Sequence, residues 1–150
     1  MQTRLAFLAV ALYSLLAPHS SLAQDSAGVR AAVLDYVEGF YTGDSTRLVR
    51  SVRPEVYKYG FFWRRDDGAY RGSQMTWEGF HRYANDVKAR GGRGAPPDAP
   101  KKIELFDVLD QTASAKLTAW WGIDYLLLAR FDGKWMITHV LWQSPPRTSQ

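Results

Sequence analysis

Residues 124–142, DYLLLARFDGKWMITHVLW, decide the fold of this chain. They predict two strands joined at Asp132-Gly133, because this dipeptide readily adopts the positive φ angles of a tight hairpin turn. Apolar residues occupy both phases of the alternation, whereas an antiparallel hairpin with one face in water is apolar on one face only. We therefore expect helices to cover one face, and another sheet or a second copy of the chain to cover the other.

The composition is that of one globular domain. The chain has 150 residues, 46% of them hydrophobic, which suffices for a full-sized core. It contains no cysteine, so disulfides, thiolate metal sites and cysteine nucleophiles are excluded. The net charge of +4 is too small to indicate nucleic-acid binding, and the basic residues fall in expected turns and loop edges.

The first 23 residues have the pattern of a secretory signal peptide. Arg4 gives a positively charged start, residues 5–16 form a short apolar segment, and Ser21 and Ala23 are the small residues of a cleavage site before Gln24. A retained anchor is the alternative, but the apolar segment is short for a membrane span. We expect an exported protein, periplasmic or secreted, with no membrane attachment after cleavage. Residues 24–143 form the expected domain and residues 144–150 a disordered tail.

The rest of the pattern predicts helices that cover a sheet. An apolar face at helical spacing runs from Val29 to Phe40, after the cap-type residues Asp25 and Ser26, and Gly43 ends it. The other expected elements are a helix at 46–52 ended by Pro54, strands at 56–63 and 69–72, a helix from Ser73 or Thr76, and strands at 103–109, 113–121, 124–131 and 134–142. Helices on one face of a curved antiparallel sheet make an α+β cone.

Three segments resemble the nuclear transport factor 2-like superfamily: DYVEGFYTGD at 35–44, RPEVYKYG at 53–60 and IDYLLLARFDGKWMITHVLW at 123–142. Within it they look most like the exported proteins called putative lumazine-binding. The resemblance covers residues 26–143 and implies a cone of three N-terminal helices packed on a curved, mostly antiparallel sheet of about six strands. It also implies a pocket between the helices and the concave face of the sheet, and a homodimer through the outer face. This fold hosts enzymes, binding proteins and assembly domains alike.

Ketosteroid isomerase, in the same superfamily, offers a comparison for catalysis. In that enzyme a tyrosine and a protonated aspartate donate hydrogen bonds to an oxyanion, and a second aspartate carries the proton. By local motif, Tyr36 matches the tyrosine and Asp124 matches the oxyanion aspartate. The position of the proton-carrying aspartate falls on or near Gly60, whose neighbours in phase are Lys58 and Phe62. Without that base the resemblance does not imply isomerase chemistry here.

Asp124 has three possible roles. It could be a hydrogen-bond donor whose pKa an apolar pocket raises, the partner of Lys58 in a buried ion pair, or a strand-start residue that accepts from turn amides after Gly122. Tyr36 lies on an apolar helix face, where a buried hydroxyl needs a partner, and Asp124 is the candidate to test. Lys58 could otherwise be a solvated strand residue.

Strand phase and the family pattern place the remaining side chains. Leu126 shares the phase of Asp124, and Trp121 shares the inward phase of the preceding strand. The family pattern places three residues of the last strand inward, namely Met136, Thr138 and Trp142. His139 then falls on the outer face, in phase with Trp135 and Ile137.

We therefore expect an exported small-molecule-binding protein for an apolar or aromatic ligand. The expected ligand-binding residues are Tyr36, Lys58 and Asp124 as polar anchors, with Phe40, Trp121, Leu126 and Trp142 as walls. One alternative is an isomerase or lyase that acts on a planar or polycyclic substrate with Asp124, the best catalytic candidate, as acid or base. A second is a dimeric interaction module with a filled core. No cofactor is expected, and the two histidines of the mature chain lie on separate elements without an acidic cluster, so no metal site is expected.

Overall fold

The computed structural model describes residues 22–146. Its elements follow in the order α1 (Leu22–Thr42), α2 (Ser45–Ser51), β1 (Val52–Arg64), β2 (Ala69–Met75), α3 (Trp77–Ala89), β3 (Lys102–Val108), β4 (Thr112–Ala119), β5 (Gly122–Phe131) and β6 (Lys134–Gln143). The predicted signal peptide lies outside the described residues, except for its last two residues, which belong to α1. None of the helices within residues 22–146 combines the length and apolarity that crossing a membrane requires.

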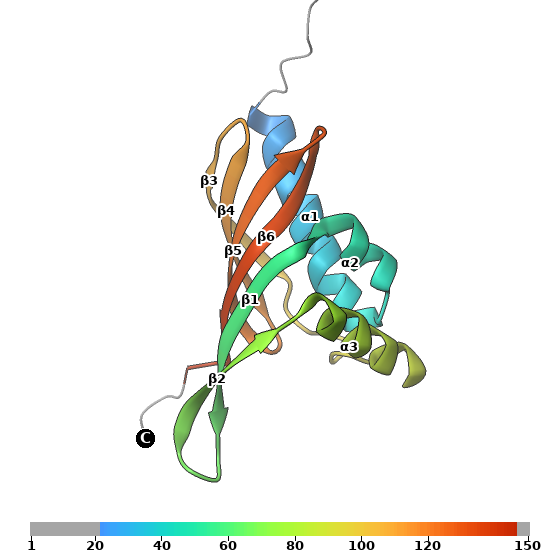
Figure 1. The fold of residues 1–150 in the computed structure, drawn as a ribbon, viewed down its shortest axis with the longest axis vertical. Helices are drawn as coiled ribbons and strands as arrows, with labels where there is room; N and C mark the ends of the chain where they lie inside the picture. Colours follow the sequence, from blue (N-terminus) through green and yellow to red (C-terminus); the bar gives the residue numbers. More distant parts are fainter. Residues whose placement is uncertain (1–21, 147–150) are drawn as a thin grey trace, which may run out of the picture.

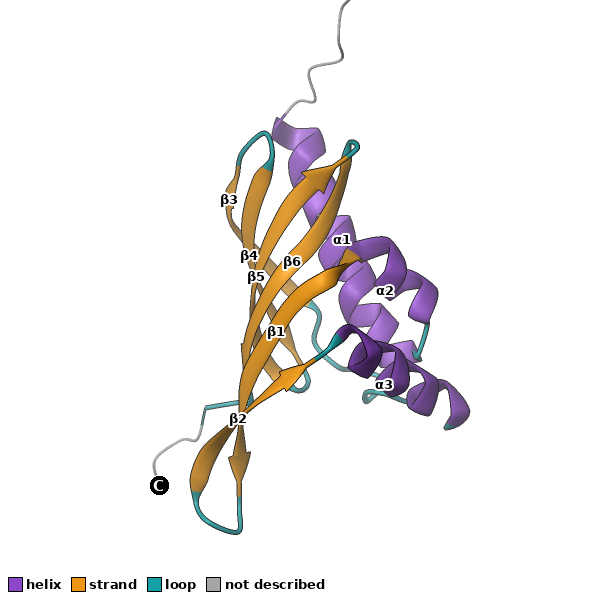
Figure 2. Ribbon diagram, viewed as in Figure 1, coloured by secondary structure: helices purple, strands orange, loops and turns teal. Residues whose placement is uncertain are grey.

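The six strands form a single curved sheet in the order β2-β1-β6-β5-β4-β3. Neighbouring strands are antiparallel, except that β1 and β6 pair in parallel. All three helices lie against one face of this sheet, and the β1–β2 hairpin extends beyond them (Figures 1 and 2). The expected α+β architecture of three helices on a mostly antiparallel sheet is confirmed.

The helix ends follow from local capping, with one exception at the start of α1. Asp44 caps α2 by accepting from the Thr46 amide at 3.0 Å, and Thr76 caps α3 by accepting from the Gly79 amide at 3.2 Å. Asp25 does not open α1, because the helix begins three residues earlier. Its buried carboxylate instead pairs with Arg130 Nη1 at 3.0 Å, which fastens α1 to the end of β5.

Strand β1 begins earlier than the sequence predicts. The expected strand starts at residue 56, after a helix ended by Pro54, but β1 starts at Val52 and contains Pro54. The pairing of β1 with β6 is irregular between Val52 and Tyr57. Proline lacks an amide hydrogen for the ladder and is tolerated in strands at such irregular positions, which explains how the strand continues through it.

A bulge in β6 overturns part of the predicted facing of that strand. Leu127 pairs with His139 and Leu128 with Ile137, so Thr138 is an extra residue in β6. Trp135 and Ile137 therefore face the helices and are buried, whereas the sequence predicts them on the outer face. The prediction that Met136 and Thr138 point inward is wrong for the same reason, because strict alternation does not hold across the bulge. Beyond it, His139 lies on the outer face and Trp142 on the inner face, as predicted.

The outer face of the sheet carries exposed apolar side chains. They surround a shallow hollow of about 410 Å³ on β1, β3, β4, β5 and β6. The large exposed members are Tyr57, Phe106, Tyr125, Leu127 and Leu141. The helices thus cover one face of the 124–142 hairpin, as expected, and its other face is apolar and open in the single chain. We call these five residues the outer apolar patch.

Ser144, the first residue of the predicted tail, forms hydrogen bonds with β1. Its amide donates to the carbonyl of Phe61 at 2.9 Å, and its hydroxyl accepts from the amide of Trp63 at 3.2 Å. Residues 147–150 of that tail lie outside the described residues.

Candidate functional site

A chain of buried polar groups connects the helices to the sheet. The hydroxyl of Tyr36 donates to Asp124 Oδ2 at 2.7 Å and accepts from Lys58 Nζ at 2.6 Å. The second carboxylate oxygen, Asp124 Oδ1, accepts from the indole nitrogen of Trp121 at 2.7 Å. Lys58 Nζ lies 4.0 Å from Asp124 Oδ2. We call Lys58, Tyr36 and Asp124 the buried polar chain.

Four different elements bring these side chains together. Tyr36 lies on the face of α1 that packs on the sheet, and Lys58 lies on the same inner face from β1. Asp124 points inward from β5, where it is paired with Trp142 of β6. Trp121 lies in the turn between β4 and β5, three residues before Asp124, so its indole reaches back to the carboxylate.

The buried polar chain is withdrawn from water. Tyr36 and Asp124 are 0% exposed and Lys58 is 6% exposed. Burial raises the pKa of the Tyr36 hydroxyl well above its usual value, and the neighbouring Asp124 carboxylate raises it further. Burial lowers the pKa of Lys58, and the attraction of Asp124 opposes this only in part. The site therefore favours a neutral tyrosine and makes the ammonium of Lys58 costly to keep.

Aromatic rings surround the Lys58 ammonium. Its Nζ lies between 4.9 and 6.0 Å from five ring centroids, those of Phe40, Tyr36, Phe80, Trp121 and Trp142. Ring faces attract a cation, and desolvation strengthens this attraction. The rings and the Tyr36 hydroxyl replace part of the hydration that Lys58 loses on folding.

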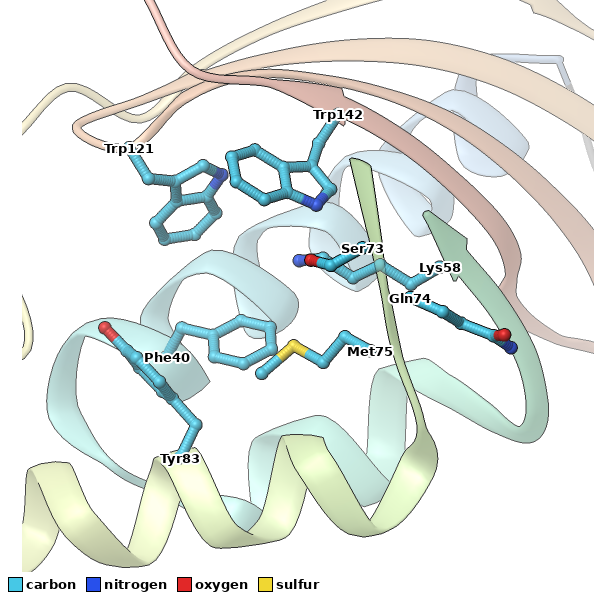
Figure 3. Close-up of a pocket in the computed structure, with 8 residues that line it drawn as sticks. All are labelled: Phe40, Lys58, Ser73, Gln74, Met75, Tyr83, Trp121 and Trp142. Carbon is cyan, nitrogen blue, oxygen red and sulfur yellow. The ribbon is translucent and has the colours of Figure 1, made fainter. Parts of the chain in front are cut away.

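A pocket of about 290 Å³ opens beside Lys58, between α3 and the inner face of the sheet (Figure 3). Eight residues line it: Phe40, Lys58, Ser73, Gln74, Met75, Tyr83, Trp121 and Trp142. Lys58 is the one charged residue among them, and most of the others are aromatic or apolar. A concave, largely apolar site with few polar groups is the usual form of a small-molecule site.

The structure separates the predicted site residues into two groups. Phe40, Lys58, Trp121 and Trp142 line the pocket. Tyr36 and Asp124 are in direct contact with each other and are fully buried behind this wall. Leu126 is a core residue of the sheet that does not line this pocket.

Ser73, Gln74, Met75 and Tyr83 are pocket residues that the sequence prediction missed. The first three belong to β2, which continues to Met75, whereas the predicted strand ends at residue 72. Tyr83 lies on α3 three residues after Phe80, so the helical spacing from that core residue was a signal that could have found it.

Gly60 occupies the position where the isomerase comparison places a proton-carrying acid. It pairs with Trp142, and a Cβ atom at this position would lie 1.9 Å from the indole nitrogen of Trp142. No side chain fits there, because the indole occupies the space. Gly60 therefore leaves room for Trp142 to line the pocket, and the indole occupies the space where the isomerase comparison places the base.

The remaining candidates for chemistry lie apart from the pocket. His139 is exposed on the outer face, and His81 packs edge-on against Trp77 on α3. Residues 22–146 contain no group of three or more histidine, aspartate or glutamate side chains arranged to hold a metal ion. The chemistry available in the pocket is that of one amine, a phenol, an amide and a hydroxyl.

Replacing Tyr36 with phenylalanine tests the buried polar chain. The variant keeps the ring but removes the acceptor of Lys58 Nζ and the donor to Asp124 Oδ2, so we expect it to lower the free energy of unfolding by about 1–3 kcal/mol. Tyr70→Phe, which alters a partly exposed hydroxyl on β2, is the matched control and should change it by less than about 0.5 kcal/mol. If urea denaturation gave the same loss of unfolding free energy for both variants, a structural role for the Tyr36 hydroxyl would be contradicted.

Comparisons with known proteins agree with this fold. Residues 24–143 match the family described as putative lumazine-binding. An NTF2-like protein of unknown function from Shewanella baltica OS155 is 19% identical, with a TM-score of 0.59 over 86% of this chain and 100% of that one. An NTF-2 like protein of unknown function from Silicibacter pomeroyi DSS-3 is 17% identical, with a TM-score of 0.63 over 83% of this chain and 98% of that one.

A third similar structure, an NTF2-like protein of unknown function from Methylobacillus flagellatus KT, is 19% identical, with a TM-score of 0.58 over 84% of this chain and 95% of that one. None of the curated proteins matches this sequence. At these identities the solved structures establish the fold alone, whereas the family match spans almost the whole described domain. The chain belongs to the putative lumazine-binding family and has the NTF2-like fold.

Proposed function

We propose that this protein binds a small planar aromatic molecule in the pocket beside Lys58. The observation that carries this proposal is an aromatic-walled pocket of about 290 Å³ whose lining residues include one charged group. Phe40, Trp121 and Trp142 offer ring faces and edges to a flat ligand, and such contacts contribute beyond the apolar area they bury. The volume lies near the lower end of the range of ligand pockets, which suits one or two fused rings.

The polar groups indicate what such a ligand carries. Lys58 is a donor and, while charged, prefers an anionic or carbonyl oxygen. Gln74 and Ser73 lie at the edge of the pocket and can both donate and accept. The family description agrees with this chemistry, because lumazine is a flat, two-ring compound with carbonyl oxygens.

The isomerase or lyase alternative finds less support in this geometry. Asp124, its candidate acid or base, has a hydrogen bond on each carboxylate oxygen and does not line the pocket. None of the eight lining residues has a carboxyl or imidazole side chain. Binding is therefore the function that these residues support best.

Binding can be tested with Trp142 and a matched tryptophan outside the pocket. We expect a pterin, which has two fused rings, to quench the intrinsic fluorescence of the wild-type protein saturably, and Trp142→Ala to weaken this binding about tenfold or more. Trp120→Ala is the control, because Trp120 is exposed and absent from the pocket lining. Equilibrium dialysis gives the affinity without relying on fluorescence. Failure of flavins, pterins and steroids alike to bind would contradict the proposal.

We also propose that the protein is exported, on the strength of its first 23 residues. We expect the mass of the protein recovered from the periplasm or the medium to correspond to a chain that starts at Gln24. Ala23→Asp should block cleavage, because the position before the cut requires a small neutral residue. Recovery of the uncleaved wild-type chain in the cytoplasm would contradict export.

A homodimer through the outer apolar patch is the third part of this proposal. Soluble monomers rarely leave large contiguous apolar surfaces exposed, and this patch covers the middle of the sheet. A second copy that presents the same face would bury it symmetrically. The apolar pattern on both faces of residues 124–142 supports the burial of the outer face by a second copy.

Leu127→Glu tests the dimer by placing a charge in the centre of the outer apolar patch. We expect light scattering to give the mass of a dimer for the wild type and of a monomer for Leu127→Glu, because burying an unpaired charge is costly. Leu109→Glu changes an exposed leucine in the turn after β3 and should leave the dimer intact. A wild-type monomer at micromolar concentration would contradict this part of the proposal.

A further inference from the structure

We propose that Lys58 is a nucleophile that forms an imine with an aromatic aldehyde or ketone bound in the pocket. This inference rests on the proposed binding function and names the class of ligand and the reaction. It is carried by the position of a single amine in the wall of an aromatic pocket, with a hydrogen-bonded route by which that amine can lose its proton.

The amine lies in the wall of the pocket, where it can meet the carbonyl carbon of a bound ligand. Lys58 lines the pocket, and its side chain extends between Trp142 and Phe40 (Figure 3). The two rings lie 6.0 and 4.9 Å from Nζ, so a flat ligand that packs between the pocket's aromatic walls meets the amine. None of the other lining residues carries an amine or a thiol, so Lys58 has no competing nucleophile of this kind in the pocket.

The buried polar chain can take the proton that a nucleophilic amine must lose. Lys58 donates to Tyr36, which in turn donates to Asp124. A shift of one proton along both hydrogen bonds leaves a neutral amine, a neutral phenol and a neutral carboxylic acid. Two opposite charges 4.0 Å apart thereby disappear from a buried site, where charged forms are costly. Burial also lowers the pKa of Lys58, and desolvated lysines in apolar pockets are the ones activated in this way.

The step balances without a redox partner. The lone pair of Nζ attacks the carbonyl carbon, the π electrons of the carbonyl move to its oxygen, and that oxygen takes up one of the two protons of Nζ. The C–O bond of the resulting carbinolamine then breaks as Nζ gives its second proton to the departing hydroxyl, so that one water molecule leaves while the C=N bond forms. The net change is an amine plus a carbonyl giving an imine plus water. Asp124 returns its proton through Tyr36 to give the protonated imine.

A trapping experiment compares Lys58 with the other lysines of the same folded chain. The wild-type protein is incubated with 2-naphthaldehyde and cyanoborohydride, which reduces an imine to a stable amine, and peptide mass spectrometry then gives the rate at each lysine. We expect Lys58 to be modified about tenfold faster at pH 7 than Lys101 or Lys134, because burial lowers the pKa of Lys58 and leaves more of its amine neutral. The advantage should shrink at alkaline pH, where deprotonation no longer limits the reaction of an amine. The titratable groups that face Lys58 are Tyr36 on α1, Tyr83 on α3 and Asp124 on β5.

Two variants distinguish the role of the Lys58 amine from the role of the groups around it. Lys58→Arg keeps a positive charge and should lose the adduct at this position, while the rates at the exposed lysines stay unchanged. Tyr36→Phe interrupts the proton route and should slow the modification of Lys58 relative to that of Lys101 in the same sample. This ratio reports on the folded protein as long as the variant keeps its thermal transition. Circular dichroism melting of each variant checks this condition.

A ligand without a carbonyl group separates this inference from the binding proposal. 2-Naphthylmethanol has the same rings as the aldehyde but cannot form an imine. Saturable binding of both compounds with no preferential adduct at Lys58 would overturn the imine and leave the binding proposal standing. Binding of neither, with equal labelling of all lysines, would overturn both. A fast adduct at Lys58 that 2-naphthylmethanol inhibits by competition would support both.

Discussion

The hydrogen bonds of one hydroxyl group, that of Tyr36, join the two layers of this protein. Tyr36 comes from α1, whereas its acceptor Asp124 and its donor Lys58 come from two strands that are not adjacent in the sheet. Without the hydroxyl, Lys58 and Asp124 would lose the group that bridges them. Leaving buried polar groups without their partners costs about 1–3 kcal/mol. The rings around Lys58 reduce this cost, and the same rings form the wall of the pocket, so stability and binding depend on the same side chains.

The bulge in β6 determines which of its side chains face the helices and which lie on the outer face of the sheet. The extra residue, Thr138, resets the alternation, so that Ile137 on one side of it and Val140 on the other both reach the core. A regular strand would have turned one of these residues outward. The bulge thus keeps the helix-facing side apolar along the whole strand while Leu127 and Leu141 remain on the outer side.

The sequence allowed the fold to be predicted better than the details of the site. The helical spacing around Tyr36, the Asp-Gly turn and the resemblance to a known superfamily were enough to predict three helices on a mostly antiparallel sheet, and motif comparison brought Tyr36, Lys58 and Asp124 to one place. The facing of Trp135 and Met136 could not be predicted, because a bulge leaves no mark in an alternating apolar strand. The pocket residues of β2 were missed because a polar, exposed strand such as Ala69–Met75 lacks the apolar alternation that identifies strands. That Asp124 lies behind the pocket wall depends on how Trp121 folds back over it, which is a matter of packing alone.

The parallel pairing of β1 with β6 has a consequence for the order in which the chain can fold. Strand β6 follows all the other described elements in the sequence, yet it lies between β1 and β5 at the centre of the sheet. A nascent chain that has not yet reached residue 134 can form helices and the β1–β2 hairpin, but β1 then has one long edge without a partner. Contacts between distant segments of this kind slow folding, because a long loop must close before they form. The sheet is therefore completed only after synthesis of its last strand, and a truncation before Lys134 removes the neighbour that β1 and β5 share.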